Sequence, residues 1–467
     1  MELSGARFVV VGLGSSGRAA VRVLRAHGAD VVANDSRDRE ALDASLGGGR
    51  ALDELEALGA TLELGGHDAA RLGQADGIVV SPGVPRLAVL DEAERAGVPV
   101  VSEVELASWF VQSTVIGVTG TNGKSTVTAW VGQMCEASGR PTFVGGNLGR
   151  PAVEVVDTDA ARGDGLVVLE LSSFQLERVD RFHANVAALL NVSDDHLDRY
   201  ESFDAYAAAK GRIFERQGDD DAAVVPDGDA RCAALARSGG GRLMTFGGAK
   251  GSVRVDGGQL VDAVSGLTVP LRALQPRGSH NVDNACASTL IARLAGVDAG
   301  AIADGLVSFK GLPHRMVRVR VIGSIAFYDD SKATNVAAAV AAVDGLTSGE
   351  DPIPGAVVLI AGGVDKGGSY APLAERVAER ARAVVTLGRA APLIEAALGE
   401  TPVPVERARD MGEAVRLALA AAQPGDAVLL APACSSFDMF TSYAARGDAF
   451  VEAVRALPEP PGRGAAR

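Results

Sequence analysis

The sequence predicts an α/β fold in three domains, each built around a mainly parallel sheet. Three observations support this prediction. Short apolar runs alternate with helical patterns along the chain, glycine-rich or polar turns follow many of these runs, and 467 residues exceed one ordinary domain. The 57 glycines and the low aromatic content of 4% suit the many tight strand-to-helix turns that such a fold requires.

The composition excludes several classes of protein. A formal net charge of −14 argues against broad binding to nucleic acid or to an anionic membrane. The four cysteines form no CxxC pair, so neither a zinc site nor a disulfide framework is expected. No basic segment followed by an apolar one opens the sequence, and no run of 18 uncharged apolar residues occurs. We therefore expect a cytoplasmic protein without membrane insertion or a nucleic-acid partner.

The first domain begins with the pattern of a Rossmann-like βαβ unit. A buried strand over Arg7–Val11 leads into the GxGxxG turn at residues 12–17 and then a helix, and Asp35 ends the next strand. This turn could hold NAD, or it could hold another diphosphate-bearing ligand. A second turn, Ser81-Pro82-Gly83, follows the strand Ile78–Val80 and either joins the same site or simply ends the strand.

The central domain contains a glycine-rich loop between a strand and a helix. The strand starts at Thr114, the loop and its flanks cover Gly117 to Thr126, and a helical pattern continues to Cys135. Glycines let main-chain N–H groups point at phosphate oxygens, Lys124 would reach the terminal phosphates, and Ser125 would ligate Mg²⁺. The loop has the short form GxxGK[ST], so a tight structural turn is the alternative to a P-loop-type nucleotide site.

Further chemical groups lie at or near the ends of neighbouring predicted strands. Glu170 ends one buried strand, where a magnesium role is favoured over that of a surface carboxylate. His196 lies in a polar turn after the strand Val186–Leu190, as a metal ligand or a structural residue. The pattern around Lys210 indicates only a solvated lysine on a helix.

The third domain repeats the alternation of strands and helices. Strands are expected over Ile325–Tyr328, Ala356–Ile360, Ala383–Leu387 and Ala427–Leu430. Polar clusters follow three of them, at residues 330–335, 362–367 and 434–436. Open α/β sheets bind ligands at such strand ends, although each cluster could also be an ordinary polar loop.

At this point the chain resembles the Mur ligase family, ATP-dependent enzymes that form amide bonds in peptidoglycan precursor synthesis. The resemblance covers nearly the whole chain. The motifs that carry it are residues 120–126, 146–149, 170–176, 191–199, 312–315 and 330–335. Residues 331–335 together with 431–438 are most similar to the members that add D-glutamate.

The resemblance implies roles for individual residues around ATP and magnesium. Lys124, His196 and Lys210 would be catalytic. ATP would be bound by Gly120, Thr121, Asn122, Gly123, Lys124, Ser125, Thr126, Asn281 and Arg315. Two Mg²⁺ ions would be bound by Ser125, Glu170, His196 and Lys210. In the family this last lysine is carbamylated, which replaces an ammonium that would repel Mg²⁺ with an anion.

The resemblance also implies two further binding sites. The UDP-linked substrate would be bound by Gly14, Ser15, Ser16, Asp35, Ser36, Ser81, Pro82, Gly83 and Asn147, so the NAD reading of the first turn falls. D-Glutamate would be bound by Lys332, Thr334, Lys366, Ser436 and Tyr443, the last of which stands where phenylalanine is usual.

The expected protein is therefore a monomeric three-domain ligase. The expected domains are residues 1–104 for the UDP-linked substrate, 105–312 for ATP and 313–467, Rossmann-like, for the amino acid. The expected substrates are UDP-N-acetylmuramoyl-L-alanine, D-glutamate and ATP, which react through an acyl phosphate.

Overall fold

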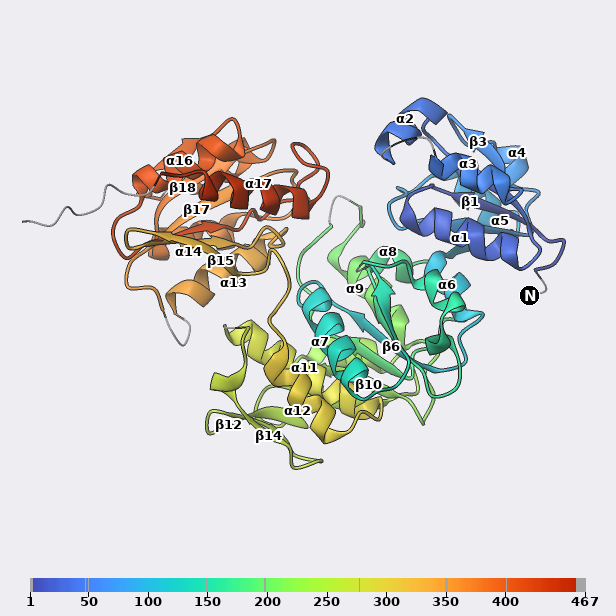
Figure 1. The fold of residues 1–467 in the computed structure, drawn as a ribbon, viewed down its shortest axis with the longest axis horizontal. Coiled ribbons are helices and arrows are strands. Elements are labelled where there is room, and N and C mark those ends of the chain that lie inside the picture. Colours follow the sequence, from blue (N-terminus) through green and yellow to red (C-terminus); the bar gives the residue numbers. More distant parts are fainter. Residues whose placement is uncertain are drawn as a thin grey trace, which may run out of the picture. The chain divides into compact units, whose positions relative to one another are not determined.

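The computed structural model describes residues 3–46, 48, 50–147, 149–196, 199–276, 278–348, 352–399 and 401–458. The chain forms two compact units. The first comprises residues 1–192, 207–269 and 285–307, and the second comprises residues 193–206, 270–284 and 308–467. Three mainly parallel sheets flanked by helices make up the fold, which confirms the expected α/β class (Figure 1).

The first sheet has five parallel strands in the order β3-β2-β1-β4-β5. Phe8 and Val10 pack in one apolar cluster and Val9 and Val11 in another, because successive residues of a strand point to opposite faces. Both faces are therefore covered, as expected of a Rossmann-like sheet. The elements are β1 (Arg7–Val11), α1 (Ser15–Ala26), β2 (Asp30–Asp35), α2 (Arg39–Ser45), α3 (Arg50–Ala57), β3 (Thr61–Leu64), α4 (Ala69–Leu72), β4 (Gly77–Val80), α5 (Ala88–Arg95), β5 (Val100–Ser102) and α6 (Glu103–Ser108).

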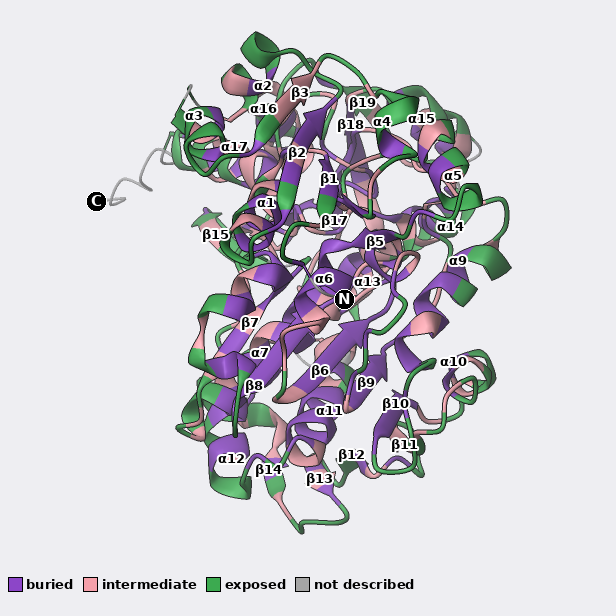
Figure 2. Cartoon of the chain, turned by 90° about the vertical axis from the view of Figure 1, so that its right-hand side faces the viewer, coloured by how far each residue is buried: buried purple, intermediate pink, exposed green. Residues whose placement is uncertain are grey.

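The central sheet has nine strands in the order β14-β13-β12-β11-β10-β9-β6-β8-β7. The strands β6 (Thr114–Thr119), β7 (Thr142–Gly146), β8 (Leu166–Glu170), β9 (Val186–Leu189), β10 (Ala222–Pro226) and β11 (Arg242–Phe246) run parallel. Figure 2 shows β8 and β9 as buried strands on either side of β6, which is buried after its first residue. The strand that precedes the glycine-rich loop therefore lies between the strands that end near Glu170 and Asn191.

The far edge of this sheet was not expected from the sequence. The strands β12 (Val253–Asp256) and β13 (Gln259–Asp262) form an antiparallel hairpin, followed by β14 (Thr268–Pro270). These strands are short and carry polar residues, so they lack the apolar runs that identified the others. The accompanying helices are α7 (Lys124–Ala137), η1 (Ala152–Asp157), η2 (Asp159–Ala161), α8 (Ser173–Leu176), α9 (Phe203–Gly211), η3 (Arg212–Phe214), α10 (Ala230–Ala236), η4 (Leu271–Ala273), α11 (Ser279–Leu294) and α12 (Ala299–Ser308).

The third sheet has six strands in the order β15-β16-β20-β17-β18-β19. It is parallel except for the β15–β16 hairpin. Helices α13, α14 and α15 pack on one face, and α16 and α17 pack on the other. The elements are β15 (Val317–Ile322), β16 (Ile325–Asp329), α13 (Val336–Thr347), β17 (Val357–Gly362), α14 (Ala371–Arg380), β18 (Ala381–Leu387), α15 (Ala391–Leu398), β19 (Val405–Arg407), α16 (Met411–Ala421), β20 (Ala427–Leu430) and α17 (Tyr443–Arg455).

The predicted strands of the third region are confirmed, and the hairpin strand β15 is an addition. Within the described part of the chain, no helix is long and apolar enough to cross a membrane.

Candidate functional site

The glycine-rich loop joins β6 to α7 as predicted. Gly120 and Gly123 have φ angles of 153° and 84°, which a residue with a Cβ atom adopts only with strain. Asn191, which follows β9, braces the loop: its side chain accepts from the Asn122 N–H at 2.8 Å and donates to the Asn122 carbonyl at 3.0 Å. The loop is therefore held in an open turn at the N-terminus of α7, where the helix dipole favours anions.

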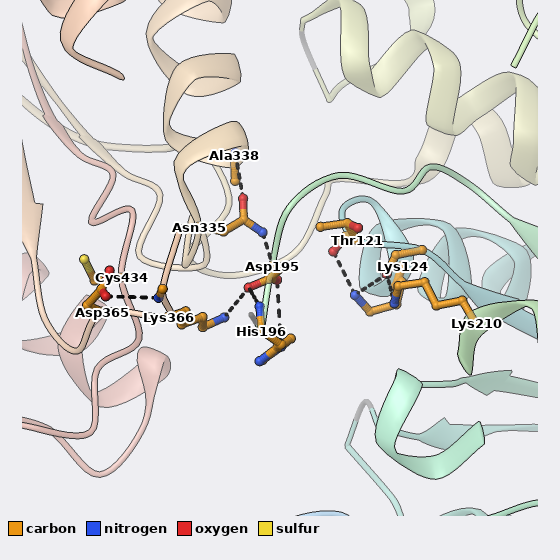
Figure 3. A network of polar contacts seen from close by, with 12 residues as sticks. Thr121, Lys124, Asp195, His196, Lys210, Asn335, Ala338, Asp365, Lys366 and Cys434 are labelled. Atoms are coloured by element: carbon orange, nitrogen blue, oxygen red, sulfur yellow. Dashed lines mark hydrogen bonds and ion pairs between the residues drawn. The ribbon is translucent and has the colours of Figure 1, made fainter. Parts of the chain in front are cut away.

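Two lysines meet at one carbonyl of this loop. Lys124 Nζ donates to the carbonyls of Gly120 at 2.8 Å and Thr121 at 2.9 Å, and Lys210 Nζ donates to the same Gly120 carbonyl at 2.9 Å (Figure 3). Lys210 is only 1% exposed, so the surface position indicated by its sequence pattern is wrong. Lys210 lies in the last turn of α9, and its side chain reaches the loop that follows β6.

Glu170 offers a carboxylate beside the loop. It pairs in register with Val118 of β6 and is 1% exposed. Asn147 Nδ2 donates to one carboxylate oxygen at 2.6 Å, whereas the other oxygen is buried and has no hydrogen-bond partner among the described residues. A buried carboxylate oxygen without a donor suits a bound cation. Ser125, the other predicted ligand here, is buried at the start of α7.

A cavity of about 540 Å³ lies at the carboxyl edge of the first sheet. All nine residues expected to bind the UDP-linked substrate line it: Gly14, Ser15, Ser16, Asp35, Ser36, Ser81, Pro82, Gly83 and Asn147. Leu148, within the same motif as Asn147, lies outside the described residues. Arg37 and His67 also line the cavity and were not predicted. His67 follows β3, a strand that the sequence pattern did not reveal.

Asp35 lines this cavity, and both oxygens of its carboxylate already bond to protein groups. Each of its carboxylate oxygens already accepts two hydrogen bonds. Of these four bonds, three come from Arg37 and one comes from the Leu13 N–H, all at 2.9–3.0 Å. Burial alone would raise the pKa of this carboxyl, but the hydrogen bonds from Arg37 and the Leu13 N–H hold it below its ordinary value. In this structure Asp35 therefore organises the loop after β2.

His196 lies in the second unit. Its φ angle is 56°, unusual for a residue other than glycine, and its side chain is 30% exposed. The preceding Asp195 is buried and accepts from Asn335 Nδ2 and Lys366 Nζ, both at 3.2 Å (Figure 3). Leu197 and Asp198 of the same motif lie outside the described residues.

The residues predicted to bind D-glutamate lie on loops at the carboxyl edge of the third sheet or, for Tyr443, at the start of α17. Lys332 Nζ lies 3.9 Å from the centroid of the Tyr443 ring, a cation–π contact. Ser436 is buried. Of the five predicted residues, only Lys366 lines the neighbouring cavity of about 210 Å³.

A buried arginine that the sequence reasoning missed connects these loops. Arg446 is 1% exposed and donates to Ser331 Oγ at 3.0 Å and to the carbonyls of Ser331 at 2.9 Å, Cys434 at 3.1 Å and Gly362 at 3.4 Å. The acceptors belong to the loops after β16 and β20 and to the last residue of β17. Burial lowers the pKa of Arg446 to about 10, so the group stays charged at neutral pH. An arginine inside a helical pattern gives no sequence signal of this role.

The two predicted ATP contacts from the second unit are Asn281 in α11 and Arg315. Asn281 Oδ1 accepts from Asn284 Nδ2 at 3.3 Å. Arg315 Nε is buried and has no hydrogen-bond partner among the described residues. Burial raises the pKa of the neighbouring Asp330 to about 7, and the positive charge of Arg315 opposes that rise.

The fold and these sites define a multidomain α/β protein with a glycine-rich loop of the GxxGK[ST] form between β6 and α7 and a cavity at the carboxyl edge of its first sheet. Three family models match the chain: the MurD-like N-terminal domain over residues 6–102, the Mur ligase middle domain over 118–292 and the glutamate ligase domain over 314–434. The chain belongs to the Mur ligase family, as its motifs predicted.

Known relatives match over their full length. The chain is 42% identical to the UDP-N-acetylmuramoylalanine–D-glutamate ligase of Acidobacterium capsulatum, over 98% of this chain and 97% of the relative. It is 44% identical to the enzyme of the same name from Desulfosudis oleivorans, over 98% of both chains. Its fold is similar to that of the MurF ligase of Thermotoga maritima in complex with ADP, with a TM-score of 0.59 and 19% identity. The match covers 96% of this chain and 94% of the MurF chain.

Proposed function

We propose that this protein is an ATP-dependent ligase that adds D-glutamate to UDP-N-acetylmuramoyl-L-alanine in peptidoglycan precursor synthesis. The observation that carries the proposal is the full-length identity of 42% and 44% to relatives named for this reaction. The phosphate loop, with Lys124, Lys210 and Glu170 beside it, supports the use of ATP.

The proposed reaction has two steps. An oxygen of the L-alanine carboxylate attacks the γ-phosphorus of ATP, the bond from that phosphorus to the bridging oxygen breaks, and ADP leaves with an acyl phosphate formed. The D-glutamate amine then attacks the acyl carbon, a tetrahedral intermediate forms, and phosphate leaves as the nitrogen loses its proton. The products are an amide, ADP and phosphate.

The phosphate loop would bind the ATP phosphates through its main-chain N–H groups and Lys124. Lys124 now donates to loop carbonyls, so ATP would offer its ammonium stronger, charged acceptors. Asn281 and Arg315 would contact the rest of the nucleotide, and the unpartnered Arg315 Nε supports this role.

Ser125 and Glu170 would hold one Mg²⁺, and the unpartnered Glu170 oxygen fits that role. His196 and carbamylated Lys210 would hold a second. Bound Mg²⁺ would offset negative charge on the transferring phosphoryl group. Carbamylation fits the position of Lys210, because its buried ammonium would be repelled by that of Lys124, which bonds to the same Gly120 carbonyl.

The cavity of the first sheet would bind the UDP moiety, since its wall includes the GxGxxG turn and the N-terminal end of α1. The carboxylates of D-glutamate would contact Lys332 and Lys366, with Thr334, Ser436 and Tyr443 around them. We further propose domain boundaries at 1–104, 105–312 and 313–467, a monomer, and a cytoplasmic location where ATP and the nucleotide precursor are available.

Phosphate release tests the proposal. The assay contains ATP, Mg²⁺ and UDP-N-acetylmuramoyl-L-alanine, with D-glutamate, L-glutamate or no amino acid. Release that requires both the nucleotide substrate and D-glutamate is the expected result. Release supported by a different amino acid would assign another ligase reaction, and release in no combination would contradict a ligase altogether.

A further inference from the structure

We propose that His67 Nε2 accepts a hydrogen bond from an N–H or O–H donor of the uridine in the first-domain cavity and thereby contributes to nucleotide specificity. The inference rests on the proposed function, because it takes the ligand of this cavity to be a UDP derivative. It concerns a residue that no motif singled out.

The position of His67 places it at the nucleoside end of the cavity. It follows the turn Gly65-Gly66 after β3, and the Gly65 N–H donates to the carbonyls of Asp35 at 3.0 Å and Arg37 at 2.9 Å. The β3 loop is thus bonded to the β2 loop, where an open α/β sheet of this kind binds the nucleoside of its ligand. His67, Asp35 and Arg37 all line the cavity.

The tautomer of neutral His67 follows from its neighbour. Asn34 is buried, and its amide nitrogen donates to the carbonyls of Glu63 at 3.0 Å and Gly66 at 2.8 Å. Two carbonyl acceptors fix the orientation of this amide, so Asn34 Oδ1 faces His67 Nδ1 at 2.6 Å. Because Oδ1 only accepts, Nδ1 carries the hydrogen and Nε2 keeps its lone pair. Nε2 has no hydrogen-bond partner within the described part of the chain and is available to a ligand.

The cavity needs such an acceptor. Uridine presents donors at N3 and at its ribose hydroxyls. The carboxylate at the end of β2 ordinarily accepts from the ribose, but both oxygens of Asp35 are already saturated by Arg37 and the Leu13 N–H. Breaking those bonds would leave the Arg37 guanidinium without its carboxylate, so the free lone pair of His67 is the better acceptor.

The experiment measures binding to the full-length protein by calorimetry. The ligands are UDP, 3-methyl-UDP, which lacks the N3 donor, and 2′,3′-dideoxy-UDP, which lacks the ribose donors. The variants are His67→Phe, which removes the acceptor, and His67→Gln, which retains one. His27→Phe is the matched control, since His27 also bonds through Nδ1, to the Val23 carbonyl at 2.8 Å, but does not line the cavity.

We expect His67→Phe to weaken UDP binding about five- to tenfold, the value of one hydrogen bond, and His67→Gln to weaken it less. The loss should vanish for one analogue, which identifies the donor as N3 or the ribose. If His67→Phe does not fold, His67→Gln carries the same test. The loss of affinity on replacing UDP by the analogue that lacks the donor should then be larger for wild type than for His67→Gln.

Other results would overturn the inference. UDP binding by His67→Phe equal to that of wild type would do so, as would the same loss for all three ligands or an equal loss in His27→Phe. A wild-type protein that binds no UDP at all would instead contradict the proposed substrate class, and the inference with it.

Discussion

At the scale of single residues, we expect the use of ATP at the glycine-rich loop to depend on the ammonium group of Lys124. Lys124→Met should lower kcat about 100- to 1,000-fold, because in the proposed mechanism it removes the positive charge that stabilises the transferring phosphate. Steady-state phosphate release measures this loss. Lys250→Met, at an exposed lysine, should leave kcat unchanged. Comparable kcat values for wild type and Lys124→Met would show that Lys124 is not a catalytic residue.

Lys210 should carry a carbamate when the protein is prepared with bicarbonate. The buried lysine shares the Gly120 carbonyl with Lys124, and conversion to an anion relieves their repulsion. A carbamate signal in ¹³C NMR after exposure to ¹³C-bicarbonate is expected in wild type and absent in Lys210→Arg. If the signal persists in Lys210→Arg, the modified group lies elsewhere.

Arg446→Met should destabilise the protein by about 2–3 kcal/mol, because it leaves buried carbonyls at three strand ends without donors. The KM for D-glutamate should rise more than the KM for ATP, since only the loops of the third sheet lose their brace. Chemical unfolding and substrate titrations measure both effects. Arg455→Met, at the exposed end of the same helix, should change stability by only about 0.5 kcal/mol.

At the scale of elements, helix α6 is anchored by two buried carboxylates. Glu103 accepts from the Val153 N–H at 3.1 Å and from Gln175 Nε2 at 3.2 Å. Glu105 accepts from Trp109 Nε1 at 2.8 Å and from three successive main-chain N–H groups at residues 180–182. Apart from the bond from Trp109, these bonds connect α6 to η1, to α8 and to residues 180–182.

Burial raises the pKa of Glu103 from 4.5 to about 7. Between pH 4.5 and about pH 7, Glu103 in the folded chain keeps a proton that it has released in the unfolded chain. The free energy of unfolding therefore falls as the pH rises, and the loss is complete above about pH 7. The penalty is on the order of 3 kcal/mol. Glu103→Gln should remove this part of the pH dependence. Thermal unfolding at about pH 5 and about pH 8 tests it.

Glu105→Gln provides the contrast. It removes acceptor capacity for three N–H groups, so it should lower the unfolding temperature at both pH values. Equal pH profiles for wild type and Glu103→Gln would show that Glu103 is not the titrating group.

At the scale of the whole molecule, the three substrates would bind to different sheets, so the reaction requires the domains to close around them. ATP, Mg²⁺ and UDP-N-acetylmuramoyl-L-alanine together should reduce the radius of gyration towards the roughly 23 Å of a compact chain of this length. Small-angle scattering measures this change. Lys124→Met with the same ligands is the control, and unchanged scattering of wild type would contradict closure.

Local patterns were sufficient for the strands with apolar cores and for the groups at their ends. Glycine turns, the alternation of strands and helices, and the carboxyl-edge rule pointed to the glycine-rich loop, Glu170 and the turn at residues 12–17, whereas the full set of nine residues that line the first cavity came from the family resemblance. These features depend on residues adjacent in the chain or on the general geometry of parallel sheets. The polar hairpin β12–β13 was not predicted, because its strands have no sustained apolar run.

Contacts between distant segments were decided by packing. Three examples are the bond from Lys210 to the Gly120 carbonyl, the bond from the Leu13 N–H to Asp35, and the bond from Arg446 to the Ser331 carbonyl. The free nitrogen of His67 depends on the Asn34 amide, whose orientation is set by the carbonyls of Glu63 in β3 and Gly66 in the turn that follows. Hydrogen bonds of this kind join residues far apart in sequence, so their partners become definite only when the chain is folded.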